Sequence, residues 1–197
     1  MHGGVPVALW STEALLAALD APPSRAEVQT WLDAWGALDG RFGAGHALQL
    51  EQVLLSASAT NSPVAFRALW VLALLAQGGK TESQGLADGL MLVLDGASSE
   101  GIRREATRAL LALPWSHSVA GALGDWAVNV VYLEGNTPAA VGQALSIIEK
   151  LIGMKLLSDC GMESVEVQDA LEHVHRIAPQ AHAKKKAALL SARLSPS

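Results

Sequence analysis

Residues 62–79 read SPVAFRALWVLALLAQGG and have a start signal and an end signal for a helix. A serine followed by proline is a typical helix start, because the hydroxyl can accept a backbone N–H bond and proline suits the first helical position. Two glycines after Gln77 are typical of a helix end. Between these signals apolar side chains cover nearly the whole circumference. We therefore expect a helix that is buried on almost every side.

Similar start signals recur along the chain in two alternating series. One series of helices is expected to begin at Ser62, Ser99, Thr137 and Pro179, at separations of 37, 38 and 42 residues. The other is expected to begin near Gly45, Thr81, Ser118 and Ser164. Sustained two-residue alternation, the signal of a strand, is absent. A two-helix unit that recurs near every 40 residues is typical of HEAT and ARM arrays. The alternative is an irregular helical bundle with coincidental spacing.

The pattern predicts an all-α protein, an α-α superhelix of about five helix pairs. We expect one HEAT-like repeat domain over residues 1–197, in which residues 1–44 form N-terminal capping helices. Within that N-terminal part, Ser24-Arg25-Ala26-Glu27 has the arrangement of a capping box, in which the hydroxyl and the carboxylate satisfy each other's backbone donors.

Composition favours a soluble protein. Half of the 197 residues are hydrophobic and 17% are charged, which is too apolar for intrinsic disorder. The longest purely apolar run, Ala68–Ala76, is far shorter than the roughly 20 residues that a bilayer span needs. Basic residues are absent before Arg25, and Cys160 is the single cysteine. We therefore expect a cytoplasmic protein without a signal peptide, a membrane contact or a disulfide framework.

Charge is distributed unevenly along the chain. Residues 1–172 hold nine basic and all nineteen acidic residues, which gives a charge of −10. Residues 173–197 hold five basic residues and no acid, which gives +5. The sequence therefore predicts an acidic body and a basic closing helix.

Several short stretches resemble a small bacterial HEAT/ARM-like repeat family of unknown function. They are FRALWVL at 66–72, GIRR at 101–104, GALGD at 121–125, PAAV at 138–141 and HAKK at 182–185. The resemblance covers roughly residues 62–190. It implies a helical-repeat fold and no established activity. Members often carry an adenylosuccinate lyase label, but such lyases are much longer and use a serine-rich flexible loop, which nothing in this chain resembles.

Basic side chains are the main candidates for a binding surface. Arg67 is the only charge in an otherwise apolar helix, so it should reach solvent or pair with an acid such as Asp88 or Asp125; a ligand-facing role is the alternative. Arg104 and Arg108 lie four residues apart, where two guanidinium groups could grip a carboxylate or phosphate. A solvated face with Glu100 and Glu105 as local partners is the favoured interpretation. The full set of candidate partner-binding residues is Arg67, Arg103, Arg104, Arg108, Asp125, Lys184, Lys185 and Lys186.

Catalytic, metal and cofactor sites are not indicated. His173 and His175 lie two residues apart in an expected helix, so they cannot both face one ion. Cys160, in an expected loop, is most simply a packed thiol. The glycine-rich stretch 40–45 lacks the Lys-Ser/Thr ending and preceding strand of a phosphate loop. We expect no catalytic residue, no metal and no cofactor.

The tryptophans separate into two groups. Four lie on apolar stripes and are expected in the core: Trp31, Trp35, Trp70 and Trp126. Trp10 and Trp115 lie near a terminus or a loop, where an indole could anchor a partner, although packing inside is the favoured interpretation.

These observations favour a non-catalytic protein–protein interaction module or scaffold, whose groove of second-helix residues would bind a protein or peptide. A second copy of the chain is a further possible partner for the basic helix. The alternative is a nucleic-acid-binding HEAT-like protein related to alkylpurine DNA glycosylases. That alternative is disfavoured, because a body with a charge of −10 would repel phosphates.

Overall fold

The computed structural model describes Ala14 and residues 17–19, 51–52, 54–56, 58–59, 63–79, 85–97, 99–133 and 137–194. All regular secondary structure in these residues is helical, which confirms the all-α prediction. The capping helices expected in residues 1–44, with Trp10, Trp31 and Trp35, lie outside the described residues apart from Ala14 and 17–19.

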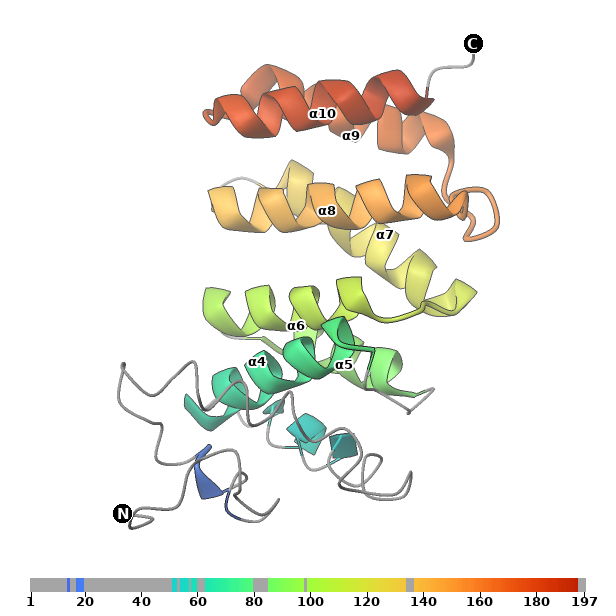
Figure 1. Cartoon of the computed structure of the whole chain (residues 1–197). Coiled ribbons are helices and arrows are strands. Elements are labelled where there is room, and N and C mark those ends of the chain that lie inside the picture. Colours follow the sequence, from blue (N-terminus) through green and yellow to red (C-terminus); the bar gives the residue numbers. More distant parts are fainter. Residues whose placement is uncertain are drawn as a thin grey trace. The chain divides into compact units, whose positions relative to one another are not determined.

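The helices begin and end close to the positions that the sequence predicts (Figure 1). They are α4 (Pro63–Gln77), α5 (Leu86–Asp95), α6 (Glu100–Ala112), α7 (His117–Tyr132), α8 (Pro138–Met154), α9 (Ser164–Ile177) and α10 (Ala181–Leu194). The largest difference is α5, which was expected from Thr81 and begins at Leu86, after Gly85, without a side-chain cap. Thr81 itself lies outside the described part of the chain.

Hydroxyl caps fix three of these starts. Ser99 Oγ accepts from Ile102 N at 3.3 Å, and Thr137 Oγ1 accepts from Ala140 N at 3.1 Å. The start of α7 was expected at Ser118, but Ser116 is its cap, because Ser116 Oγ accepts from Val119 N at 3.2 Å. Each such bond satisfies one of the backbone donors that a helix start leaves unpaired.

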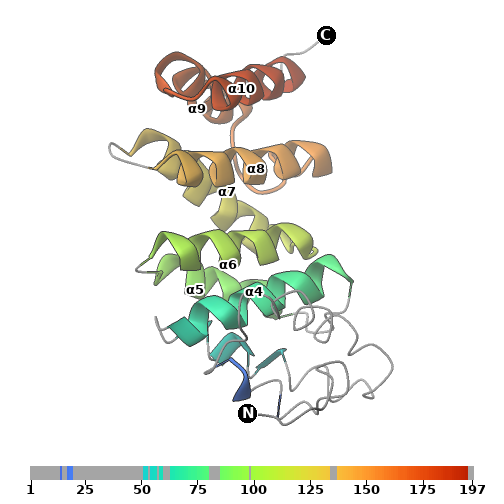
Figure 2. The same ribbon diagram turned by 60° about the vertical axis from the view of Figure 1, so that its left-hand side comes forward.

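The chain divides into two compact units, Met1–Leu113 and Pro114–Ser197. In the first unit, α6 packs against both α4 and α5. In the second unit, α7 pairs with α8 and α9 with α10, while α7 also contacts α9 and α8 contacts α10 (Figure 2). Contacts to the next helix and to the next but one are those of stacked helix hairpins, so the packing is compatible with an α-α superhelix. The five-pair solenoid and the single domain over 1–197 stay predictions.

Apolar faces form the core of each unit as the helical periodicity predicts. In α4 the buried side chains are Ala65, Ala68, Leu69, Val71, Leu72, Ala73, Leu75 and Ala76. In the second unit, apolar residues at helical spacing are buried on three helices, at Leu145, Ile148 and Leu151 of α8, at Val167, Leu171 and Val174 of α9, and at Ala183, Ala187 and Leu190 of α10. A Cβ atom at Gly124 would meet the end of the Met162 side chain, so glycine there leaves room for Met162 to pack against α7.

Candidate binding groove

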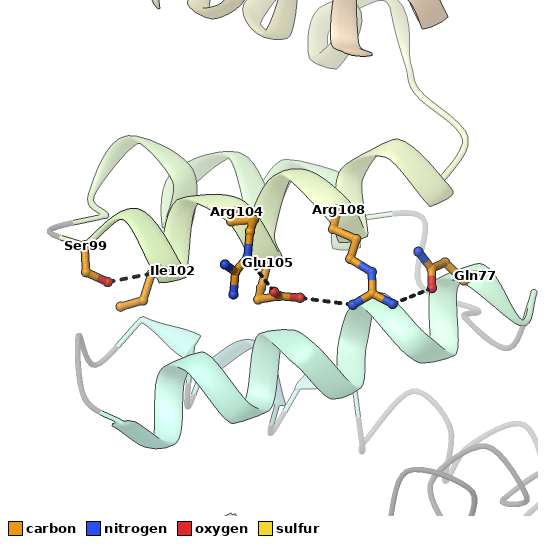
Figure 3. A network of polar contacts seen from close by, with 6 residues as sticks. All are labelled: Gln77, Ser99, Ile102, Arg104, Glu105 and Arg108. Atoms are coloured by element: carbon orange, nitrogen blue, oxygen red, sulfur yellow. Dashed lines mark hydrogen bonds and ion pairs between the residues drawn. The ribbon is translucent and has the colours of Figure 1, made fainter. Parts of the chain in front are cut away.

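Two of the three arginines of α6 are held by a buried carboxylate. Glu105 lies between Arg104, whose Nε is 3.0 Å from Glu105 Oε1, and Arg108, whose Nη1 is 3.4 Å from Oε2. Arg108 also donates to Gln77 Oε1 at 3.0 Å, which ties α6 to the end of α4 (Figure 3). The local pairing favoured from the sequence is therefore present, and these two guanidinium groups support α6.

The other two candidate arginines also have partners within the first unit. Arg103 Nη1 lies 3.8 Å from Glu100 Oε2, and its Nε donates to the Ala97 carbonyl at 3.4 Å. Arg67 donates from Nε to the backbone oxygen of Leu19. This acceptor could not be predicted from local sequence patterns, because it lies 48 residues away along the chain.

The three lysines of α10 differ in their surroundings. Lys186 Nζ lies 2.8 Å from Glu149 Oε2 and 3.0 Å from Ser146 Oγ, both on α8. Lys184 Nζ donates to the Arg176 carbonyl at 3.4 Å, whereas Lys185 is exposed. The basic charge of this helix is thus partly used to join α10 to α8.

A cleft of about 490 Å³ lies in the second unit, on the first helices of its two pairs. Its lining comes from the ends of α7 and α9 and from the residues that follow them, with Pro138 and Val141 of α8. Tyr132 and His173 form its aromatic wall, with ring centroids 4.9 Å apart. The exposed fractions of Tyr132, Leu133 and Ile177 are 45%, 62% and 56%, which is unusual for such side chains gathered in one place.

An acidic recess of about 400 Å³ adjoins this cleft, and Tyr132 lines both. Asp125 and Asn129 of α7 and Glu166 and Asp169 of α9 are part of its lining. Spacings of three and four residues place these side chains on one face of each helix. We call the cleft and the recess together the α7–α9 groove.

The carboxylates of the recess are not neutralised locally. Within the part of the chain that the structure describes, no basic side chain lies within ion-pair distance of Asp125, Glu166 or Asp169. Their field reaches the aromatic wall. Partial burial raises the pKa of Tyr132, the negative charges of Asp169 and Glu166 raise it further, and Arg176 opposes them. The groove therefore has an apolar end and a negative end.

The sequence predicts a groove lined by the second helix of each pair. The α7–α9 groove is instead lined mainly by α7 and α9, the first helices of their pairs. On the second helices of this unit, α8 and α10, the ion pair between Glu149 and Lys186 joins the two helices. Of the candidate residues, only Asp125 lines the α7–α9 groove. Sequence reasoning missed Tyr132 and Ile177, although the single tyrosine of the chain and an isoleucine at the edge of the α9 stripe were available signals.

A second hollow, in the first unit, is smaller, at about 260 Å³. Leu55, Gly89 and Leu92 are among its lining residues, and none of the lining residues is charged. It offers less space and no electrostatic discrimination, so we take the α7–α9 groove as the candidate site.

The other groups singled out from the sequence form no such site. Among the described residues, no group of three or more His, Cys, Asp and Glu side chains could hold a metal ion. Cys160 is half-buried, and burial together with Asp159 raises the pKa of its thiol, which disfavours the reactive thiolate. Trp115 is buried, as favoured, whereas Trp70 and Trp126 are only half-buried.

Lys150 provides a pH-dependent test of the packing. Its Nζ lies 4.1 Å from the centroid of the Trp115 ring, and burial lowers its pKa to about 8. The ring favours the ammonium form, so it opposes this shift without cancelling it. Between pH 8 and the ordinary pKa of 10.5, the unfolded chain binds more protons than the folded one. Stability from this group therefore rises with pH across that window.

Replacement of Lys150 by methionine should consequently stabilise the protein below pH 8. Because the side chain remains partly exposed and screened, we expect a gain of about 1 kcal/mol or less. The gain should shrink between pH 8 and 10.5, as shown by urea unfolding across this range. The control is Lys185→Met, on an exposed lysine. An equal gain at every pH, or the same profile in the control, would show that burial of Lys150 is not the cause.

No family model, curated protein or solved structure matches this chain. None of the described helices combines the length and the hydropathy needed to cross a membrane.

Proposed function

We propose that this chain is a non-catalytic protein–protein interaction module of the HEAT-like kind, which binds a segment of a partner protein in the α7–α9 groove. The observation that carries the proposal is the exposure of Tyr132, Leu133 and Ile177 around one cleft. Exposed apolar side chains gathered at a concave surface are typical of interaction sites. The proposal includes a cytoplasmic location and kinship with the small HEAT/ARM-like family.

The size of the cleft supports this function. Its volume, about 490 Å³, lies within the range of about 300–1,000 Å³ that is usual for ligand pockets. Such a space accommodates one or two large side chains of a partner segment. Nucleic acid is a poorer candidate, because Asp125, Glu166 and Asp169 beside the cleft would repel phosphate groups.

A selection from a library of short random peptides tests the proposal. The full chain would be immobilised and exposed to the library, and enriched peptides would be synthesised and titrated by calorimetry. We expect a reproducible set of peptides that share an apolar residue and bind one site per chain. Failure to enrich any peptide over an empty support in repeated selections would contradict the proposed function.

A further inference from the structure

We infer that the partner segment combines an apolar side chain, seated in the cleft, with lysine or arginine placed over the acidic recess. This inference rests on the proposed function and adds the chemistry of the ligand. Tyr132 lines both hollows, so a single short segment that crosses this residue contacts the apolar end and the negative end together.

Charge complementarity selects this occupant. Some acidic side chains elsewhere in the described part of the chain, such as Glu105 and Glu149, lie against arginine or lysine, whereas others, such as Asp88, lie singly and away from any basic side chain. Asp125, Glu166 and Asp169 line one recess together and have no such partner among the described residues. Like charges gathered in this way repel each other, and a cation supplied by the ligand would relieve the repulsion.

Other ligands suit the groove less well. The described residues include no set of side chains that could hold a metal ion there. An anionic ligand would meet three carboxylates. A wholly apolar segment would bury the Tyr132 side of the recess without satisfying those carboxylates, which opposes binding. A segment that is both apolar and basic satisfies each end.

The test combines variants of the protein and of an enriched peptide. In the protein, Glu166→Gln and Asp169→Asn would be combined. In the peptide, each lysine or arginine would be replaced by glutamine. We expect either change alone to weaken binding by about tenfold at low salt. Together they should weaken it little further, because both remove the same interaction. Binding of the unmodified pair should also weaken as salt rises.

The matched control is Glu163→Gln combined with Glu172→Gln. Glu163 lies at the start of α9 and Glu172 lies within this helix, and neither lines the groove. Their replacement changes the net charge by the same amount as the combined Glu166→Gln and Asp169→Asn variant. We expect affinity for the basic peptide to change less than about twofold, since exposed charges outside the site contribute little.

The outcomes separate this inference from the proposed function. If the enriched peptides contain no basic residue but their binding still depends on Ile177, the inference is overturned and the proposed function stands. Equal weakening by both pairs of variants would also overturn it, because only net charge would then matter. Sedimentation of the chain alone adds a further outcome. If the chain forms a dimer that the combined Glu166→Gln and Asp169→Asn variant dissociates, a second copy of the chain occupies the groove. That result would overturn the inference.

Discussion

Replacement of Leu145 by alanine should lower the free energy of unfolding by about 2–5 kcal/mol, the range for a large side chain removed from a packed core. Leu145 is fully buried in α8, the helix that contacts both α7 and α10. A cavity there removes packing from the core of the second unit. Urea unfolding followed by circular dichroism would measure the loss.

Leu189→Ala, on the exposed side of α10, is the control for this variant. The exposed fraction of Leu189 is 58%, so its truncation should change stability by about 0.5 kcal/mol or less. A loss below about 1 kcal/mol for Leu145→Ala would contradict the core that the structure assigns to the second unit.

A companion variant, Leu72→Ala in α4, tests the domain organisation. Leu72 is fully buried in the first unit. A single repeat domain over 1–197 predicts that both core variants shift one shared unfolding transition, because neighbouring repeats stabilise each other. Two separate transitions, each sensitive to only one variant, would contradict a single domain.

Replacement of Ile177 by glutamine should weaken binding of an enriched peptide by about tenfold to a hundredfold. Burial of an aliphatic side chain contributes about 1.5–3 kcal/mol, and each 1.4 kcal/mol is about a tenfold change in affinity. Ile177 lines the cleft and is 56% exposed, so a ligand can bury it further. Glutamine has a similar size and favours a helix, which keeps α9 intact.

The matched control for this variant is Leu189→Gln, an equally exposed aliphatic residue of the same unit outside the groove. Both variants should keep the far-ultraviolet circular dichroism and melting temperature of the parent. If Ile177→Gln keeps its fold and binds the peptide with unchanged affinity, the cleft is not part of the binding site.

Most of the fold was accessible to sequence reasoning because its signals are local. Ser99 and Thr137 mark helix starts through bonds to backbone atoms three residues away. The apolar residues Val167, Leu171 and Val174 of α9 recur at helical spacing and are buried. The start of α5 was expected near Thr81 but lies at Leu86, since Gly85 before it has no side chain that could signal a cap.

The candidate site was less accessible because it depends on which helix faces meet. Arg104 and Arg108 were attractive as a binding pair, and the alternative with Glu105 as partner could be weighed from their spacing alone. The groove, in contrast, joins Tyr132 to Ile177 across two helices separated by a whole helix of sequence. Periodicity indicates which side of each helix is apolar. It does not predict which part of that side stays exposed once the neighbouring helices have packed against it.

Photo-cross-linking would locate the bound peptide on the surface of the protein. An enriched peptide would carry benzoylphenylalanine in place of its shared apolar residue and would be irradiated with the full chain, and the attachment site would be mapped by mass spectrometry. If the α7–α9 groove binds the peptide, attachment will fall within α7 and α9, close to Tyr132, His173 or Ile177, and the unmodified peptide will compete with it. Attachment confined to α4 and α6, or to the outer side of α10 around Leu189, would contradict binding in this groove.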